Sequence, residues 1–303
     1  MMYLEGIIVC VNYSDFLAHT LPHNKSHFDN LVVVTDTSDK STKWLCEYYN
    51  VKCIQTDIFY ENSDKFNKGA AIDLALKQLD KKGWVLHLDS DIYLPPKTRF
   101  ILNNLNLDES KIYGADRLMC PNYESWIDFI DNPQKIQEGW VYVHLDAFPV
   151  GVRLAEYHSE SGWEPLGYFQ MWNPKVSGVS NYPTEHGLAD RTDVLQAKKW
   201  TREKRELLPE IITIHLDSEG LNTNQMGKNW QGRKTKLFSR NKNTKLSKKG
   251  YRKIVFNSIL KRKLKKITLY ALITILITII TFLFFNFWGF HYLNIIKSLV
   301  SNF

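Results

Sequence analysis

The stretch "WVLHLDSDIYLPP" (84–96) places two acidic residues at the end of an apolar run. Its first half is typical of a strand buried on both faces of a parallel sheet. Asp89 and Asp91 close the run, and residues two apart in an extended segment point the same way. Two carboxylates held side by side repel each other unless a cation lies beside them. We therefore expect a divalent cation with oxygen ligands here, which would in turn hold a phosphate.

Three further apolar runs precede this one, and helix-like segments separate them. The segment 67–83 has Ala71, Leu74, Ala75 and Leu79 at helical spacing, with Gly83 as the expected stop. Alternation of strands and helices predicts an α/β domain with a mostly parallel central sheet flanked by helices. The expected strands are 6–11, 30–36, 52–56 and 84–89, and the expected helices are 38–50 and 67–83.

Charge divides the chain into an acidic body and a basic tail. The 303 residues carry a formal charge of +7, with 39 Lys and Arg against 32 Asp and Glu. Twelve of the basic residues lie in 240–266 and one more is Lys297, which leaves 26 against 32, or about −6, in residues 1–239. We therefore expect the basic segment to act separately from the body and to contact anionic lipid headgroups, and we expect no nucleic acid partner. The four cysteines lack metal-site spacing and are expected to be reduced cytosolic thiols.

The segment "ITLYALITILITIITFLFF" (267–285) contains 19 residues without a charge or a proline. At about 1.5 Å per residue it is long enough to cross a bilayer core of roughly 30 Å. Trp288 and Tyr292 stand where interface aromatics are common. Basic residues crowd the side before this span, so the body is expected to face the cytoplasm as a single-pass protein anchored at its C-terminus. We expect a basic membrane-surface linker at 240–266, a transmembrane helix at 267–290 and a short tail at 291–303.

The order of the motifs resembles that of the GT-A fold glycosyltransferases, most closely their family-2-like members. The chain has "VCVNYSD" (9–15), "VVVTDTSD" (32–39), "FNKGAAIDLAL" (66–76) and "LHLDSDIYLPP" (86–96) in that order. The resemblance covers roughly residues 5–240 and implies a GT-A catalytic domain at 1–239. It also implies a nucleotide-sugar donor and Mn²⁺ or Mg²⁺ as the cofactor.

The resemblance implies a role for each matching residue at the donor site. Asn12 and Tyr13 would lie against the base, and Asp36 would accept a hydrogen bond from it. Lys68 stands where arginine is more usual in the family, and Asn67 precedes it. Asn67 and Lys68 would approach the ribose or the diphosphate of the donor. Asp89 would contact the ribose or a metal-bound water, and Asp91 would bind the metal.

The second half of the body is richer in aromatic residues. The segment "GYFQMWNP" (167–174) contains Gln170 and Trp172 and suits a sugar pocket, because sugar faces stack on aromatic rings. Aromatic residues that simply pack in the protein core would give the same composition. "WVYVHLD" (140–146) reads as a structural strand.

The segment "YPTEHGLADRTDVLQAKKW" (182–200) corresponds to the place where the family carries its catalytic base. Asp193 is our first choice for that base and Asp190 our second. Both stand where a helix begins, so either one would equally serve as a cap. Arg191 departs from the family's acidic pair, and a retaining enzyme would need no base here.

The strand "IITIHLD" (211–217) delivers His215, which the resemblance implies as a further metal ligand. Imidazole favours Mn²⁺ over Mg²⁺. The loop that follows would close over the donor and place cations on the diphosphate; its candidate residues are Lys228, Trp230 and Arg233.

These observations predict a metal-dependent glycosyltransferase that moves a sugar from a nucleotide sugar, UDP-linked by preference, to a hydroxyl acceptor at a membrane. Two alternatives remain from the residues alone. One is a nucleotidyltransferase of similar α/β fold, which would release pyrophosphate. The other is a non-catalytic, tail-anchored protein that binds a sugar nucleotide.

Overall fold

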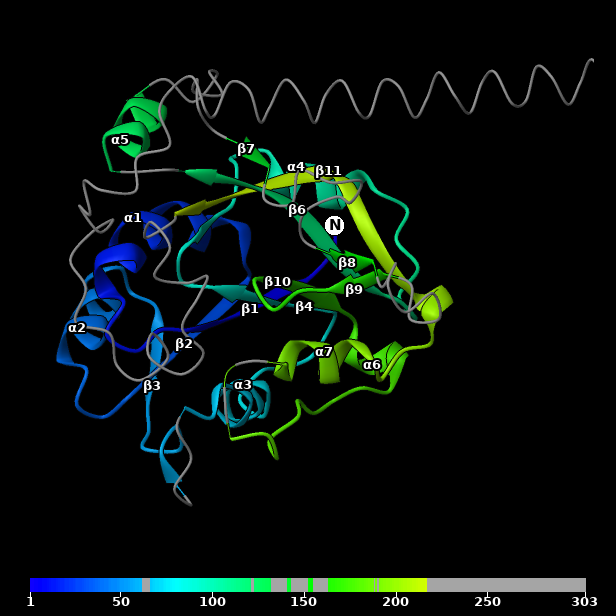
Figure 1. Cartoon of the computed structure of the whole chain (residues 1–303), viewed down its shortest axis with the longest axis horizontal. Coiled ribbons are helices and arrows are strands. Elements are labelled where there is room, and N and C mark those ends of the chain that lie inside the picture. The colour runs from blue at the N-terminus through cyan, green and yellow to red at the C-terminus, as the bar shows by residue number, and fades with distance from the viewer. Residues whose placement is uncertain are drawn as a thin grey trace, which may run out of the picture. The chain divides into compact units, whose positions relative to one another are not determined.

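The computed structural model of the chain describes residues 1–61, 66–120, 123–131, 141–142, 152–154, 163–187, 189 and 191–216 (Figure 1). The chain divides into two units, Met1–Arg252 and Lys253–Phe303, and the second lies wholly outside the described residues. The expected linker at 240–266 and membrane span at 267–290 therefore stay predictions. Within the described residues no helix is both long and apolar enough to cross a bilayer.

The first half of the body forms the four expected strands as a parallel sheet. Strands β1 to β4 lie in the order β3-β2-β1-β4, and every neighbouring pair is parallel. Leu4 and Ile8 contribute to the core on one face of β1, and Ile7 and Val9 to the core on the other, as the continuous apolar runs predict. The bounds are β1 Leu4–Val9, β2 Asn30–Thr35, β3 Lys52–Gln55 and β4 Trp84–Asp89.

The second half of the body makes the sheet mixed. β10 (Phe169–Trp172) inserts between β4 and β6 (Ile112–Cys120) and runs antiparallel to both. The expected parallel pairing is thus found among the first four strands and again between β6 and β11 (Arg205–Leu216), and it is interrupted by antiparallel β10. β6 runs parallel to β4 because β10 is antiparallel to each. The other strands are β5 Ile92–Tyr93, β7 Val141–Tyr142, β8 Val152–Leu154 and β9 Trp163–Pro165, of which β8 and β9 pair separately.

Helices cover both faces of the sheet. α1 and α2 bury Leu17, Leu21 and Leu45 against one face, and α3 buries Ile72 and Leu76 against the other. The helix α3 ends at Leu76, before the expected stop at Gly83. The α-helices are α1 Ser14–Asn24, α2 Lys40–Tyr48, α3 Lys68–Leu76, α4 Thr98–Asn104, α5 Tyr123–Asp131, α6 Pro174–Ser177 and α7 Thr192–Ala197; 3₁₀ turns occupy Lys25–His27 and Arg202–Lys204.

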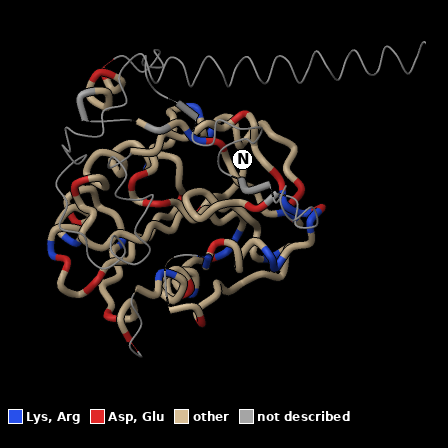
Figure 2. Tube along the Cα trace, in the orientation of Figure 1, with Lys and Arg blue, Asp and Glu red and all other residues tan. Residues whose placement is uncertain are grey.

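Strands β1, β2, β4, β6 and β11 all end at one edge of the sheet, since each pairing between them is parallel or passes through antiparallel β10. Ligands of open α/β sheets bind outside this carboxyl edge. Basic and acidic residues are interspersed along the described trace (Figure 2). The charges that distinguish the carboxyl edge are therefore individual buried pairs.

Candidate active site

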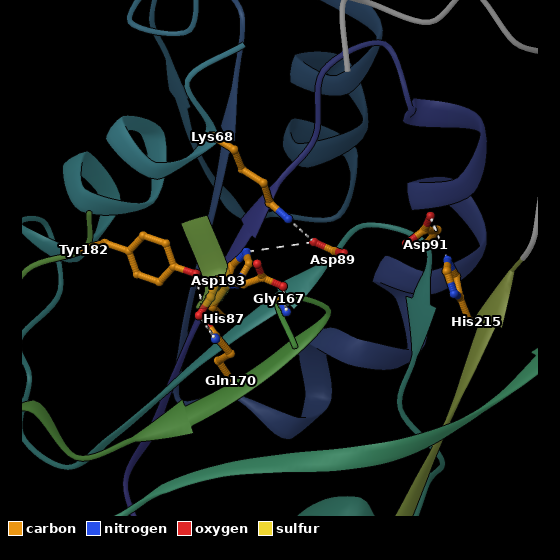
Figure 3. Close-up of polar contacts among 9 residues, drawn as sticks. All are labelled: Lys68, His87, Asp89, Asp91, Gly167, Gln170, Tyr182, Asp193 and His215. Carbon is orange, nitrogen blue, oxygen red and sulfur yellow. Dashed lines mark hydrogen bonds and ion pairs between the residues drawn. The ribbon is translucent and has the colours of Figure 1, made fainter. Parts of the chain in front are cut away.

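Asp91 and His215 meet at the carboxyl edge. Asp91 follows β4, and His215 lies in β11, where it pairs with Ile92 of β5. His215 Nε2 lies 3.2 Å from Asp91 Oδ2, and both residues are less than 10% exposed (Figure 3). The backbone fixes this approach, because the Leu216 N–H donates to the Asp91 carbonyl at 2.9 Å. The predicted convergence of two distant segments is thus present in the fold.

Asp89 forms an ion pair with Lys68, the first residue of α3 (Figure 3). The side chains are 25% and 11% exposed, so the pair is largely screened from water. Burial raises the pKa of Asp89, and the neighbouring Asp91 raises it further, while Lys68 and then His215 lower it. Since Asp91 and His215 both act on Asp89, the two pairs belong to one electrostatic site.

His87 lies beneath this ion pair and is completely buried. Its Nε2 is 4.0 Å from Asp89 Oδ1, and neither ring nitrogen has a hydrogen bond among the described residues. Burial lowers its pKa well below the ordinary value, and Lys68 lowers it further. The imidazole is therefore neutral.

The donor atoms of Asp91 and His215 suit a divalent ion. Two ligands at right angles, each about 2.1 Å from an ion, stand about 3 Å apart, close to the separation of Nε2 and Oδ2. The described residues contain no cluster of three His, Cys, Asp or Glu side chains gathered for a metal. The described chain thus offers two ligands, and Asp89, the third predicted ligand, contacts Lys68. A metal at this site would need the remaining ligands from substrate phosphate and water, as is common for Mg²⁺ and Mn²⁺ bound with nucleotides.

The expected base-binding end lies at β1 and β2. The Asn12 backbone has a φ of 56° and donates its N–H to Asp39 Oδ2 at 2.7 Å. Asp39 caps α2 by accepting from the Thr42 N–H. Asp36 is 7% exposed, and its Oδ1 accepts from the Ser38 N–H at 2.9 Å. Each turn is thus held by a backbone N–H that donates to a carboxylate. Burial raises the pKa of Tyr60, and the Asp36 carboxylate raises it further.

Asn67 organises the start of α3. Its Oδ1 accepts from the Ala70 N–H, and its Nδ2 donates to the Thr184 carbonyl at 2.8 Å. The adjoining Gly69 has no room for a side chain, because an added Cβ would overlap the Pro183 carbonyl oxygen. Asn67 therefore joins α3 to the 182–184 segment and sets the direction in which Lys68 leaves the helix.

Asp193 and Gln170 lie in a second polar network (Figure 3). The Gly167 N–H donates to Asp193 Oδ2 at 2.8 Å, and Gln170 Nε2 donates to the Asp193 carbonyl at 2.9 Å. Gln170 Oε1 accepts from the Tyr182 hydroxyl at 2.6 Å. Asp193 lies in the first turn of α7, as expected, but it does not cap that helix, since Arg191 precedes the helix in a left-handed conformation. Its carboxylate is held by Gly167 at the start of the β10 segment.

The structure places Gln170 and Trp172 in the core. Both are fully buried, and Trp172 Nε1 donates to the Val179 carbonyl at 3.0 Å. A direct contact with a sugar would require these protein contacts to be replaced. The remaining sequence candidates, Asp190, Lys228, Trp230 and Arg233, lie outside the described residues, and Tyr13 is half-buried beside Phe16.

Several residues of the site were not singled out from the sequence. Asp39 had a visible signal, since it precedes a helix-like segment and an N-cap aspartate is common there. Gly167 and Tyr182 had none, because their roles depend on contacts with Asp193 and Gln170 that only the fold creates.

Comparison with known proteins gives likenesses to solved structures alone. No protein-family model matches the chain, and no curated protein matches it. Glucosyl-3-phosphoglycerate synthase from Mycobacterium tuberculosis, in complex with Mn²⁺, UDP-glucose and phosphoglyceric acid, is 13% identical, with 71% of this chain and 72% of that one covered and a TM-score of 0.39. The same enzyme with UDP is 14% identical over 38% of this chain, with a TM-score of 0.30.

Mannosyl-3-phosphoglycerate synthase from Rubrobacter xylanophilus is 16% identical, with 38% of this chain and 40% of that one covered and a TM-score of 0.31. The chain spans 44% of the UDP complex. Likenesses at these identities and TM-scores do not establish the function of this chain.

Proposed function

We propose that this protein is a metal-dependent glycosyltransferase that transfers a sugar from a nucleotide sugar, UDP-linked by preference, to a hydroxyl acceptor. The observation that carries the proposal is the meeting of Asp91 with His215 beside the Asp89–Lys68 pair. The site lies at the carboxyl edge, next to β1, the strand that precedes the turn at Asn12. Gly167, which holds Asp193, directly precedes Tyr168, whose carbonyl accepts from the Asp89 N–H. A phosphate-binding cation site between a base-binding turn and a carboxylate is what glycosyl transfer requires.

Asp91 and His215 would hold the ion, Mn²⁺ in preference to Mg²⁺ because one ligand is an imidazole. The ion supplies positive charge for the diphosphate of the donor. Lys68 supplies a fixed cation beside the ion, and its pairing with Asp89 holds the ammonium group at the edge of the sheet. The ion and Lys68 together would give the diphosphate a positively charged seat without a basic surface.

Asp193 would act on the acceptor. The acceptor oxygen forms a bond to the anomeric carbon, the bond from that carbon to the diphosphate oxygen breaks, and the hydroxyl proton passes to Asp193. The products are the glycosylated acceptor and a nucleoside diphosphate. The Gly167 N–H fixes Asp193 Oδ2, and the Val194 N–H contacts Oδ1 at 2.9 Å, so the carboxylate is aimed before substrate arrives.

Product analysis tests the proposal. The full chain in detergent micelles is incubated with UDP- and GDP-sugars, with and without Mn²⁺, and the released nucleotide is identified. We expect metal-dependent release of a nucleoside diphosphate, lost in Asp91→Asn and His215→Ala. Release of pyrophosphate from a nucleoside triphosphate and a sugar phosphate would instead establish a nucleotidyltransferase. Binding of a donor without turnover under any condition would indicate a non-catalytic protein that binds a sugar nucleotide.

We also propose that the enzyme works at the cytoplasmic face of a membrane, anchored by residues 267–290 with the basic segment 240–266 on the lipid surface. The charge asymmetry of the sequence supports this. Alkaline extraction of membranes should leave the full chain in the pellet and release a chain truncated after residue 239. Release of both would contradict the anchor.

A further inference from the structure

Arg117 is a cation next to the proposed site that the proposed reaction leaves without a role. It lies in β6, where it pairs with Thr213 of β11, and it is half-buried. Its guanidinium carbon lies 4.0 Å from the centroid of the Tyr168 ring. Among the described residues its side chain makes no ion pair and no hydrogen bond, and its Nε is buried without a partner.

An arginine held in this way is costly unless something binds it. A buried N–H without a partner destabilises the fold, because its hydration is lost and nothing replaces it. Stacking on an aromatic face leaves all five N–H donors in the guanidinium plane unused. An oxyanion approaching Nε and one terminal nitrogen from the side would satisfy two of them at once, which is the geometry that arginine uses for phosphate and carboxylate.

Tyr168 places this cation between the two halves of the site. Its carbonyl accepts from the Asp89 N–H at 3.3 Å, and the preceding Gly167 donates to Asp193. The Tyr168 hydroxyl donates to the Ala115 carbonyl at 2.7 Å, so the ring cannot turn away. Arg117 is therefore carried by a fixed platform whose backbone touches both the metal side and the proposed base.

The position of β6 indicates which substrate the cation would meet. The base-binding turns at Asn12 and Asp36 lie on the β1 and β2 side of β4, whereas β6 lies two strands away on the other side. At about 4.8 Å per strand this is roughly 10 Å from β4 in the direction opposite to the nucleotide. No ion pair joins Arg117 to Asp116 among the described residues, although both charges act on the Tyr168 hydroxyl.

We propose that Arg117 is the anion-binding residue of the acceptor subsite, where it holds a phosphate or carboxylate group of the acceptor while Asp193 takes the proton of the reacting hydroxyl. The inference rests on the proposed function and names the acceptor class: an alcohol that also carries an oxyanion.

Sulfate and acetate are the probes, as mimics of the phosphate and of the carboxylate. The full chain in detergent micelles is saturated with UDP and Mn²⁺, so that the donor site is filled, and each anion is titrated by calorimetry. We expect one saturable anion site, with the tighter anion naming the acceptor group. Arg117→Met should weaken it by at least about tenfold, the loss of roughly one charge-assisted bidentate contact. Arg117→Lys keeps the positive charge but loses the planar guanidinium, so its anion affinity should fall between those of the wild type and Arg117→Met.

Matched variants separate a site from a general charge effect. Lys97→Met removes one exposed positive charge just before α4. Arg99 of that helix contacts the Met2 carbonyl, which precedes β1, so this charge lies toward the amino edge of the sheet, away from the carboxyl edge. The Lys97→Met variant should bind the anion as the wild type does, and the basic tail is the same in every variant. Tyr168→Phe keeps the ring and should keep the site, whereas Tyr168→Leu removes the platform and should weaken it.

Equal anion affinity in wild type and Arg117→Met would overturn the inference. Weaker UDP–Mn²⁺ binding in Arg117→Met, with anion binding intact, would overturn it too, because the arginine would then serve the donor. The anion titration is also run without nucleotide. If the wild type fails to bind any nucleotide, the proposed function fails, while an Arg117-dependent anion site would still be measured in that arm.

Discussion

His215 Nε2 lies 3.2 Å from Asp91 Oδ2, although more than a hundred residues of chain separate the two. β11 reaches Asp91 by pairing with β5, which directly follows the turn that carries Asp91. Because the sheet fixes both residues, the pair needs little rearrangement to bind an ion. A pair held in this way is what the proposed metal-dependent reaction would require of its metal ligands.

His215→Ala should remove the response to Mn²⁺. We expect release of nucleoside diphosphate to fall by about 100-fold or more, and the thermal stabilisation of the donor complex by Mn²⁺ to disappear. Titration of Mn²⁺ against both signals measures the effect. His23→Ala is the matched control, since His23 is exposed on α1 and should leave both signals unchanged. A variant that responds to Mn²⁺ as the wild type does would exclude His215 as a ligand.

The sequence predicted the parallel half of the sheet because each of those strands is a continuous apolar run with a helix after it. It did not predict the antiparallel insertion of β10. β10 is buried on both faces, with Phe169 and Met171 on one face and Trp172 on the other. Its aromatic composition suggested a sugar pocket, although the segment is a central strand of the sheet. Apolar periodicity records burial, and it does not record the direction or the neighbours of a strand.

The same limit separates the site residues that could be predicted from those that could not. Asp89, Asp91 and His215 each end an apolar run, so their place at one edge follows from strand topology. The ion pair between Lys68 and Asp89 joins a helix start to a strand end, and the sequence assigned the two residues to different partners. Nothing in the sequence marked Arg117 as a site residue, because its proposed role depends on its contact with the Tyr168 ring, which only the fold creates.

Lys68→Met should destabilise the fold in a manner that depends on pH. Burial already raises the pKa of Asp89 above its ordinary 3.8, and loss of Lys68 would raise it further. A carboxyl whose pKa is higher in the folded state weakens folding as the pH rises through that range, because the buried charge then has to form. The deficit of Lys68→Met should thus be small below about pH 4 and grow toward neutral pH. At neutral pH it should stay below the roughly 3–5 kcal/mol typical of fully buried pairs.

Urea unfolding in metal-free buffer between acid and neutral pH measures this deficit. Adding Asp89→Asn to Lys68→Met removes the titrating group, so the double variant should lose the pH-dependent part of the deficit. A deficit that is constant with pH, or largest in acid, would show that Lys68 stabilises the fold by some means other than its pairing with Asp89.

Asp193→Asn should slow turnover while leaving donor binding intact. The asparagine Oδ1 can still accept from the Gly167 N–H, so that contact is kept, while the Val194 N–H loses its acceptor and the proton-accepting ability is lost. We expect release of nucleoside diphosphate to fall by about 10²–10⁴-fold, the usual contribution of a general base. The UDP affinity measured with Mn²⁺ should not change. Full activity in this variant would indicate a retaining reaction or another base.

Gly167→Ala tests the aim of the same carboxylate. An added Cβ would stand 2.9 Å from Asp193 Cβ and 3.3 Å from its Oδ2, so the side chain would have to move. Turnover should fall, with donor affinity unchanged. Gly178→Ala is the control, because nothing lies within 4 Å of its added Cβ and its cost is confined to a φ of 74°. Equal turnover in both glycine variants would show that the Gly167 contact does not position the base.

Tyr182→Phe should lower stability by an amount that does not vary with pH. The change removes the hydroxyl that donates to Gln170 Oε1 at 2.6 Å and leaves a fully buried acceptor unpaired. The expected loss in the free energy of unfolding is about 1–3 kcal/mol. Burial raises the pKa of Tyr182 well above 10, with smaller contributions from Asp193 and Asp89, so the hydroxyl keeps its proton and the bond persists. The loss should therefore be equal at pH 6 and pH 9, unlike that of Lys68→Met, whereas Tyr48→Phe, at a residue 68% exposed, should cost less than about 0.5 kcal/mol. A loss in Tyr182→Phe no larger than in Tyr48→Phe would show that Gln170 is held in place without the tyrosine.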